Sequence, residues 1–153
     1  MKEDKEILLV EDNADDVELS IHALRLENLA NHIEIARDGE EALDYLFCRG
    51  RYSHRSFDHP PHLVLLDLKL PKVDGLEVLR AVKSDLRTRP IRVVILTASR
   101  EEKDLVNGYQ LGVNAYIQKP VDFEKFRQIV KQLGLFWLVV NQPPPPGAFR
   151  QVA

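Results

Sequence analysis

Residues 63–75 have the sequence LVLLDLKLPKVDG, in which four apolar side chains are followed at once by a carboxylate, Asp67. A short run of consecutive apolar residues is typical of a strand that is buried on both faces of a parallel sheet. In open sheets of this kind, ligands bind outside the carboxyl ends of the strands. The stretch therefore predicts a buried strand over 63–66 and places Asp67 where a ligand site is expected.

Four other short apolar runs occur along the chain, and helical patterns lie between them. The runs cover residues 7–10, 33–36, 93–96 and 115–117. Strands that alternate with helices form right-handed crossovers, which give a parallel sheet with helices on both faces. The sequence therefore predicts one α/β domain over residues 1–140, built on a doubly wound, five-stranded parallel sheet.

Three positions have a residue pattern that begins a helix. Asp38 is followed three residues later by Glu41, which predicts a capping box at the start of the helix after the second strand. Ser99 and Glu102 form a second pair of this type, and Asp122 can cap the final helix. These positions fit the expected alternation of strands and helices.

The composition is that of an ordinary globular protein and excludes several functional classes. The chain has 153 residues, with 21 Lys and Arg against 24 Asp and Glu and a formal net charge of −3, so it lacks the positive excess of nucleic-acid binders. A single cysteine, Cys48, excludes an internal disulfide. The longest apolar run, 135–140, is far shorter than the roughly 20 residues of a membrane span, and the N-terminus does not resemble a secretory signal. We expect a cytoplasmic protein with no nucleic-acid or membrane partner.

Two segments do not follow the alternation of strands and helices. Residues 49–62, RGRYSHRSFDHPPH, form a long connection rich in Arg and His. We interpret it as a solvated loop, with a partner- or anion-binding loop and a metal site at His54, His59 and His62 as alternatives. Residues 141–153 include four consecutive prolines, which favour an extended, semi-rigid polyproline II tail, with docking on an aromatic groove of a partner as the alternative.

Polar side chains follow four of the five predicted strands. Glu11 and Asp12 come after the first strand, Asp67 after the third, Thr97 at the end of the fourth and Lys119 after the fifth. Three carboxylates in one confined site repel one another, so the cluster needs a cation. Oxygen ligands with room for water favour Mg²⁺, which together with the ammonium brings the formal charge to zero. Such a site can then hold a phosphoryl group on Asp67.

A simpler interpretation of the first acidic pair is that it belongs to the helix that follows. Asp12 or Asn13 can cap that helix, and Asp15 and Asp16 suit the dipole of its first turn. An isolated acidic pair would favour this interpretation. We favour a functional site because acids, a threonine and a lysine follow four strands of the same sheet.

Four motifs in order give the chain a specific resemblance to the receiver domains of two-component response regulators. They are ILLVEDN at 7–13, LVLLDLKLPKVDG at 63–75, VVILTAS at 93–99 and AYIQKP at 115–120. The resemblance covers about residues 5–134 and implies the flavodoxin-like strand order 2-1-3-4-5. It also implies a phosphoprotein of a signalling phosphorelay rather than an enzyme.

The resemblance implies a role for each acidic residue of the site. Asp67 is expected to accept the phosphoryl group. Asp12 and Asp67 are expected to bind Mg²⁺ together with the backbone carbonyl of Lys69. Glu11 replaces the commoner aspartate and is expected to act mainly through metal-bound water.

The fourth and fifth strands are expected to supply the remaining contacts of the phosphoryl group. The resemblance implies that Thr97 hydrogen-bonds to the phosphoryl oxygens and that the Lys119 ammonium pairs with them. It also implies a cis peptide bond between Lys119 and Pro120, which aims this ammonium at the phosphoryl site. Tyr116 would be the aromatic side chain whose rotamer reports activation. Ser99, like Lys69, occupies a position that tunes hydrolysis of the acyl phosphate.

We interpret the chain as a phosphorylation-controlled switch that takes a phosphoryl group from the phosphohistidine of a sensor histidine kinase. Residues 141–153 are too few for a DNA-binding or catalytic output module, so output is expected through protein contacts or onward phosphotransfer. With the insertion 49–62 and the pair Phe136-Trp137, the chain looks like the small stand-alone regulators that serve bacterial phytochrome histidine kinases. The input signal and the downstream target are not specified by the sequence.

Two other functions remain as alternatives. A Mg²⁺-dependent phosphatase that resembles the haloacid dehalogenases would also use a strand-end aspartate, but it needs a second aspartate where this chain has Lys69. A flavodoxin-like cofactor carrier would need a phosphate-binding loop after the first strand, where this chain has Glu11 and Asp12. Both are less consistent with the motifs than a receiver domain.

The apolar pattern of the expected final helix predicts self-association. Its apolar side chains recur at steps of three and four and form a stripe able to face the sheet: Phe123, Phe126, Ile129, Val130, Leu133, Phe136, Trp137 and Val140. Leu135, Leu138 and Val139 fall outside this stripe, so 135–140 is apolar all round. We expect a homodimer unless the insertion or the tail covers this patch within one chain, and the resemblance to receiver domains implies that its interface is formed by the fourth helix, fifth strand and fifth helix.

Overall fold

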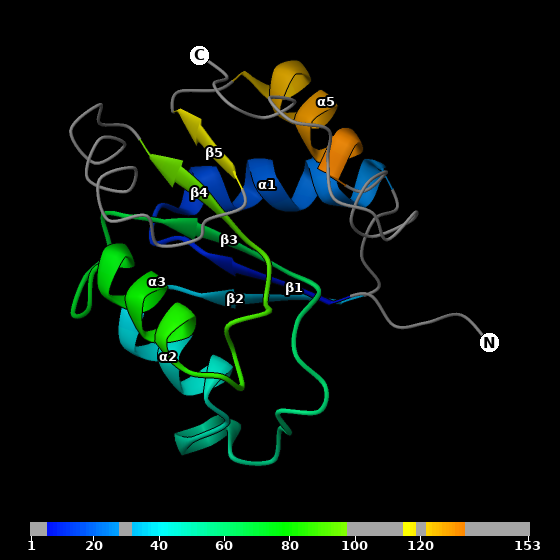
Figure 1. The fold of residues 1–153 in the computed structure, drawn as a ribbon. Helices are drawn as coiled ribbons and strands as arrows, with labels where there is room; N and C mark the ends of the chain where they lie inside the picture. Colours follow the sequence, from blue (N-terminus) through cyan, green and yellow to red (C-terminus); the bar gives the residue numbers. More distant parts are fainter. Residues whose placement is uncertain (1–5, 28–31, 98–114, 119–121, 134–153) are drawn as a thin grey trace.

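The computed structural model describes residues 6–27, 32–97, 115–118 and 122–133 of the chain. Its strands form one parallel sheet in the order β2-β1-β3-β4-β5 (Figure 1). The strands are β1 (Glu6–Val10), β2 (His32–Ala36), β3 (Leu63–Asp67), β4 (Val93–Thr97) and β5 (Ala115–Gln118). The predicted parallel order 2-1-3-4 is confirmed, and the short strand β5 lies beside β4.

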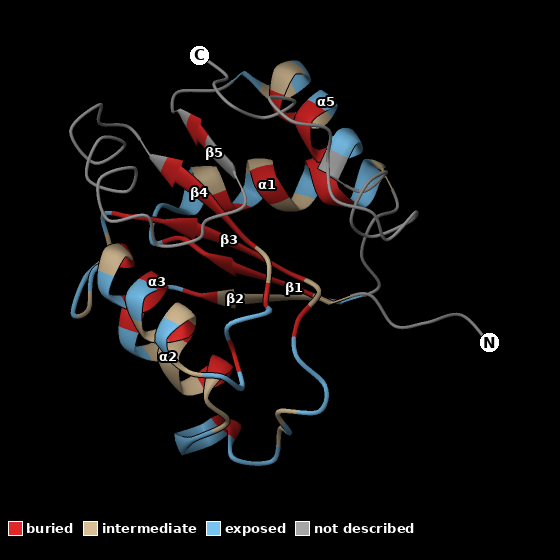
Figure 2. Cartoon of the chain, in the orientation of Figure 1, coloured by how far each residue is buried: buried red, intermediate tan, exposed pale blue. Residues whose placement is uncertain are grey.

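Helices cover both faces of the sheet. On one face, α1 (Ala14–Leu26) lies beside α5 (Phe123–Leu133), while α2 (Gly39–Leu46) and α3 (Gly75–Ser84) lie on the other (Figure 1). Alternate residues of β1 divide between the two cores: Ile7 and Leu9 pack toward α1 and α5, Leu8 and Val10 toward α2 and α3. Figure 2 shows β1 and β3 as buried strands between these layers. Apolar runs therefore became strands because both of their faces are covered.

The helices α1, α2 and α5 begin at side chains that the sequence predicts, whereas α3 begins at Asp74, a cap that was not predicted. Asp38 Oδ1 accepts from the backbone N–H of Glu41 at 2.8 Å, and Asp122 Oδ1 accepts from that of Lys125 at 2.9 Å. Asn13 caps α1. The capping box at Asp38 is only half formed, however, because the Glu41 carboxylate accepts from the Arg37 N–H at 3.3 Å instead. The pair Ser99 and Glu102 lies outside the described residues.

The loop 49–62 is mostly exposed, as predicted for a solvated loop, but several of its residues also anchor it to the domain. Tyr52 ends a short 3-10 turn, η1 (Gly50–Tyr52), and is buried, which raises the pKa of its hydroxyl. Arg55 lies over the ring of Tyr45 at 3.6 Å and donates to Glu6 Oε1 at 3.0 Å. Near the end of the loop, His62 Nδ1 accepts from the backbone N–H of Glu6 at 3.2 Å. The loop therefore fastens the start of β1 to the C-terminal end of α2.

The loop histidines do not form the metal site considered as an alternative. Within the described part of the chain, the one group of three acidic, His or Cys side chains close enough to share an ion contains no histidine. His54 and His59 are exposed, whereas His62 is used by Glu6. This alternative is therefore excluded for the described structure.

Several predicted features fall on residues that the structure does not describe. They are the fourth helix, the bond between Lys119 and Pro120, the apolar run 135–140 and the tail 141–153. No helix of the described segments is long and apolar enough to cross a bilayer.

Candidate metal and phosphoryl site

Three carboxylates meet where β1 and β3 end. Glu11 follows β1, Asp12 comes next, and Asp67 is the last residue of β3, which pairs directly with β1. One oxygen from each of these side chains lies within 4.8 Å of those of the other two. Glu11 is 0% and Asp67 7% exposed, whereas Asp12 is exposed to solvent. The site is therefore buried on the side of Glu11 and Asp67 and open to solvent at Asp12, as a site that admits a ligand requires.

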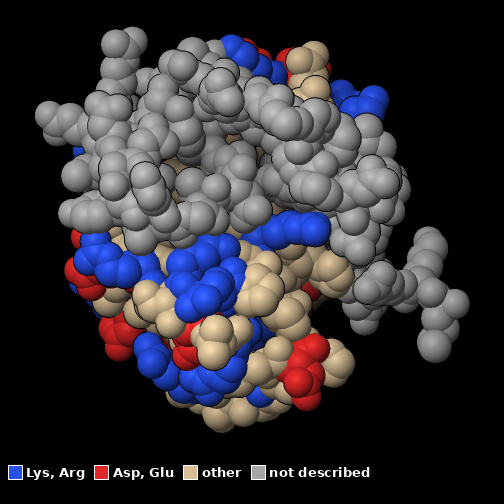
Figure 3. All heavy atoms as spheres, in the orientation of Figure 1, with Lys and Arg blue, Asp and Glu red and all other residues tan. Residues whose placement is uncertain are grey.

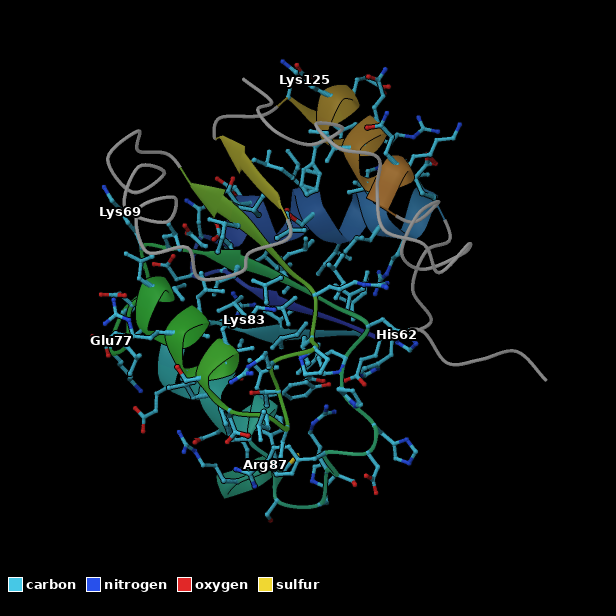
Figure 4. All side chains as sticks on the ribbon, viewed as in Figure 1. His62, Lys69, Glu77, Lys83, Arg87 and Lys125 are labelled. Carbon is cyan, nitrogen blue, oxygen red and sulfur yellow. The ribbon has the colours of Figure 1, made fainter. Side chains whose placement is uncertain are left out.

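Backbone hydrogen bonds position the two buried acidic residues, through the main chain of Glu11 and through the carboxylate of Asp67. The Glu11 N–H donates to the Ala36 carbonyl at 3.0 Å, which continues the pairing of β1 with β2 beyond the strand. The Lys69 N–H donates to Asp67 Oδ1 at 3.3 Å. Asp67 is thus oriented by its own loop, while the exposed Lys69 side chain lies at the outer side of this loop (Figure 4).

Two glycines pack closely against the loop that follows Asp67, one near each end of the loop. This role for them was not predicted from the sequence. The Gly75 N–H donates to the Leu68 carbonyl at 2.8 Å, and a Cβ at Gly75 would lie 2.4 Å from the Asp67 carbonyl oxygen. A Cβ at Gly39 would lie 1.8 Å from the Val73 carbonyl oxygen. Neither position has room for a side chain, so α2 and α3 can approach the loop only because both residues are glycine.

Further contacts join the same loop to the start of α2. The Gly39 N–H donates to the Pro71 carbonyl at 3.3 Å, and Lys72 Nζ lies 3.6 Å from Asp38 Oδ2. Lys72 has a φ of +68°, a left-handed conformation that costs a residue with a Cβ about 1 kcal/mol. Strained residues of this kind gather at functional sites. The loop is therefore held in one shape by its neighbours on both sides.

The geometry fits a hard divalent cation. Three carboxylate oxygens at this separation repel one another, and an ion bound between them removes that repulsion. Beside Asp12 the surface forms a pocket of about 550 Å³. Its other lining residues come from the loop and the start of α3: Leu68, Lys69, Leu70, Pro71, Asp74 and Leu76. The site thus offers oxygen ligands and space for water or a donor molecule, which suits Mg²⁺ or Mn²⁺.

The structure brings together only part of the predicted site. The backbone of Thr97 ends β4 and pairs with Gln118, which places it at the same edge of the sheet as Asp67. The side chains of Thr97 and Tyr116 are not described, and Lys119 lies outside the described residues. The roles expected of these three residues stay predictions.

A parallel sheet with this strand order and three carboxylates at its carboxyl edge defines a receiver-type signalling domain. Residues 7–131 match the family model of the response regulator receiver domain, and the chain belongs to that family. This assignment makes the chain a signalling protein rather than an enzyme and replaces the phosphatase and cofactor-carrier alternatives.

Within this family, the chain is similar to several phytochrome-associated response regulators. The response regulator Rcp1 of Synechocystis sp. is 38% identical over 88% of this chain and 89% of its own. The bacteriophytochrome response regulator AtBRR is 55% identical, with a TM-score of 0.76 over 92% of this chain and 100% of its own. The phosphorylated cyanobacterial phytochrome response regulator RcpA is 42% identical, with a TM-score of 0.80 over 94% of this chain and 100% of its own. Rcp1 has also been solved in a Mn²⁺-bound form, at 37% identity and a TM-score of 0.78 over 92% of this chain and 99% of its own.

Proposed function

We propose that this chain is a phosphorylation switch that accepts a phosphoryl group on Asp67 from the phosphohistidine of a sensor histidine kinase. A carboxylate oxygen of Asp67 attacks phosphorus, an acyl phosphate bond forms, and the bond from phosphorus to the histidine nitrogen breaks. The observation that carries the proposal is the triad of Glu11, Asp12 and Asp67 at the carboxyl edge of the sheet, in which Glu11 and Asp67 are buried and Asp12 is open to solvent. The phosphorylated structure of RcpA supports it as a property of a relative.

The ion in this proposal is Mg²⁺. Asp12 and Asp67 bind it directly with the backbone carbonyl of Lys69, and Glu11 acts mainly through a metal-bound water. Mg²⁺ takes few carboxylates and keeps several waters, which fits a site with one open side. The Mn²⁺-bound form of Rcp1 supports this choice, because both ions prefer oxygen ligands.

The metal also makes the reaction electrostatically possible. An acyl phosphate carries a charge of about −2 beside the remaining carboxylates, so an uncompensated site would repel it. Phosphoryl transfer depends mainly on positioning and charge neutralisation. In this proposal, Thr97 hydrogen-bonds to the phosphoryl oxygens and Lys119 pairs with them, while Ser99 and Lys69 set the lifetime of the product.

The partner follows from the same relatives. AtBRR and RcpA are named for bacterial and cyanobacterial phytochromes, so we propose a phytochrome-type histidine kinase as the donor for this chain. Because such a kinase is phosphorylated by ATP, we propose that phosphotransfer to this chain takes place in the cytoplasm. The receiver unit would extend over 1–140, with 141–153 as a proline-rich tail.

Metal binding should depend on Asp12 more than on Glu11. Asp12→Ala removes a direct ligand and should lower Mg²⁺ affinity by more than about 100-fold, while Glu11→Gln, an outer ligand, should lower it about tenfold. Isothermal titration measures both affinities, and intact-protein mass after treatment with acetyl phosphate, with and without Mg²⁺, measures phosphorylation. Phosphorylation of the wild type without Mg²⁺, or equal affinity of Asp12→Ala and wild type, would contradict the proposal.

We also propose a homodimer through the fourth helix, β5 and α5. The observation behind it is the apolar run 135–140, which follows the described part of α5 in the sequence. The described part of α5 buries Phe126, Ile129 and Val130 in the core that it shares with the sheet and α1. A contact of this kind would exist with or without phosphate on Asp67.

The dimer is tested by sedimentation at micromolar protein, with and without acetyl phosphate. We expect a dimer in both states, because apolar burial rather than phosphate holds the interface. Leu138→Glu or Val139→Glu should produce a folded monomer, checked by an unchanged circular dichroism spectrum. A wild-type protein that is monomeric in both conditions would exclude this interface.

A further inference from the structure

The end of the sheet opposite the carboxylate site carries an exposed surface built from two segments that are distant in the sequence. Its position is clear in Figure 4, where Arg87 lies at the far end of α3 from Lys69. We call it the Leu86 surface, and it consists of Phe47, Arg49, Phe57, Leu86, Arg87 and Arg89. It shares no residue with the proposed phosphoryl site.

Leu86 is the apolar centre of this surface. Its exposed fraction is 77%, the larger of the two values found for exposed large apolar side chains in the described structure. Leu86 lies in a turn in which the Asp85 carbonyl accepts from the N–H groups of Thr88 at 3.2 Å and Arg89 at 2.8 Å. Asp85 Oδ1 also accepts from the Arg87 N–H at 2.8 Å. The turn is thus closed by its own hydrogen bonds, and it holds Leu86 outward.

Side chains fasten the same turn to α3 and to Ile91, which precedes β4. Lys83 Nζ donates to the carbonyls of Arg89 at 3.0 Å and Ile91 at 2.7 Å, while Arg89 Nε donates back to the Lys83 carbonyl at 3.0 Å. The buried Thr88 hydroxyl donates to the Val82 carbonyl at 2.7 Å. Because the turn is ordered before any partner arrives, binding to it costs little conformational entropy.

Arginines stacked on aromatic rings extend the surface from Leu86 to the loop 49–62. Arg87 lies over the Phe57 ring at 4.2 Å, Phe57 lies 6.3 Å from Phe47, and Arg49 lies over the Phe47 ring at 5.6 Å. The side chains of Arg87 and Arg49 are 58% and 56% exposed. Figure 3 shows Lys and Arg side chains gathered over this end of the molecule. Rings that hold guanidinium groups in place make an ordered set of donors.

Each of these two arginines already has an acidic neighbour but keeps donors for another. Arg87 donates to Asp85 through Nε and Nη2, and it lowers the pKa of Asp85 to about 2, mainly through the side-chain hydrogen bond. Arg49 donates to Asp44 through Nε alone. A guanidinium has five N–H donors, so both side chains can still bind a second carboxylate.

We propose that the Leu86 surface binds an acidic segment of a partner protein, in which apolar side chains alternate with carboxylates. Leu86 and the ring of Phe57 receive the apolar side chains, and Arg87, Arg89 and Arg49 receive the carboxylates. Arg and aromatic side chains around an apolar centre are the groups that dominate protein interfaces. A nucleic acid fits less well, because the exposed Leu86 at the centre of the surface has no apolar counterpart in a continuous phosphate backbone.

The test uses a short fluorescein-labelled peptide of alternating Glu and Leu and measures its binding by fluorescence anisotropy. We expect saturable binding to the full-length protein, weakened about tenfold by Leu86→Ser, the effect of leaving one leucine side chain exposed. Arg87→Gln should weaken it by a similar factor. Asp67→Asn should bind like the wild type, so this outcome is independent of the proposed phosphorylation.

The chain offers a matched control on the opposite face of the sheet. Leu26, 45% exposed, and Arg25 are likewise an exposed leucine beside an arginine, at the end of α1. Leu26→Ser and Arg25→Gln should leave peptide binding unchanged. The proposal would be overturned if these variants reduced binding as much as Leu86→Ser, or if the peptide did not bind saturably. A peptide with Ser in place of Leu that bound equally well, or an oligonucleotide that bound more tightly, would also overturn it.

Discussion

Asp67→Asn is expected to abolish phosphorylation by acetyl phosphate, while wild-type protein becomes phosphorylated in the presence of Mg²⁺. The amide that replaces the carboxylate has no oxygen nucleophilic enough to attack phosphorus, and it removes one of the two direct carboxylate ligands proposed for the metal. Asn has nearly the same shape as Asp, and Asp67 is 7% exposed, so packing should be kept. Intact-protein mass gives the fraction phosphorylated.

Two controls make this result specific. Asp15→Asn changes an exposed carboxylate of the first turn of α1 and should leave phosphorylation unchanged. The thermal unfolding midpoint of Asp67→Asn without metal should be no lower than that of the wild type, because the substitution removes repulsion from Glu11 and Asp12. An Asp67→Asn protein that still gained a stable acyl phosphate in the wild-type proportion would refute the assignment of Asp67.

Gly75→Ala is expected to destabilise the protein and to weaken Mg²⁺ binding at the same time. The added methyl group would lie 2.4 Å from the Asp67 carbonyl oxygen and 2.5 Å from the Leu68 Cα, and neither backbone atom can move without moving the site. Overpacking of this kind costs about 3 kcal/mol. Chemical denaturation measures the loss in the free energy of unfolding, and isothermal titration measures the loss of Mg²⁺ affinity.

The sign of the effect separates this explanation from a simple change in helix propensity. Gly75 is the first residue of α3, and replacing a helical glycine with alanine normally stabilises by about 0.5–1 kcal/mol. Glu77→Ala, an exposed position two residues later in α3, should change stability only slightly and leave Mg²⁺ affinity unchanged. Wild-type stability and metal affinity in Gly75→Ala would show that α3 does not press on the Asp67 loop.

The strands and the acidic residues of the site could be predicted because their signals are local. An apolar run such as 63–66 can be satisfied only by burial on both faces, and parallel pairing then brings Glu11 and Asp67 to one edge. The caps at Asp38 and Asp122 were predictable for the same reason, since the bond from an N-cap spans only three residues.

What the sequence did not reveal depends on contacts between distant elements. The requirement for glycine at positions 39 and 75 arises from the approach of two helices to one loop, and neither local sequence signals that approach. The packing of Arg55 on Tyr45 and Glu6 likewise turned an apparently solvated segment into an anchored one. The Glu41 carboxylate accepts from the backbone N–H of Arg37 rather than from that of Asp38, which the capping box predicts. It also accepts from the side chains of Arg51 and Tyr52 in the loop 49–62.

The central place of β1 in the sheet also determines when the fold can be completed during synthesis. β1 pairs with β2 on one side and β3 on the other, and the contact of Glu6 with His62 spans 56 residues. Because β1 precedes β2, the insertion and β3 in the chain, its second edge stays unpaired until the whole insertion and β3 have been synthesised. Contacts of such long range slow folding, because the intervening chain must be ordered before they form. The bond from Arg55 to Glu6 fastens the insertion at the start of β1, beside the edge with which β3 pairs, and until β3 is in place that edge is open to pairing with another chain.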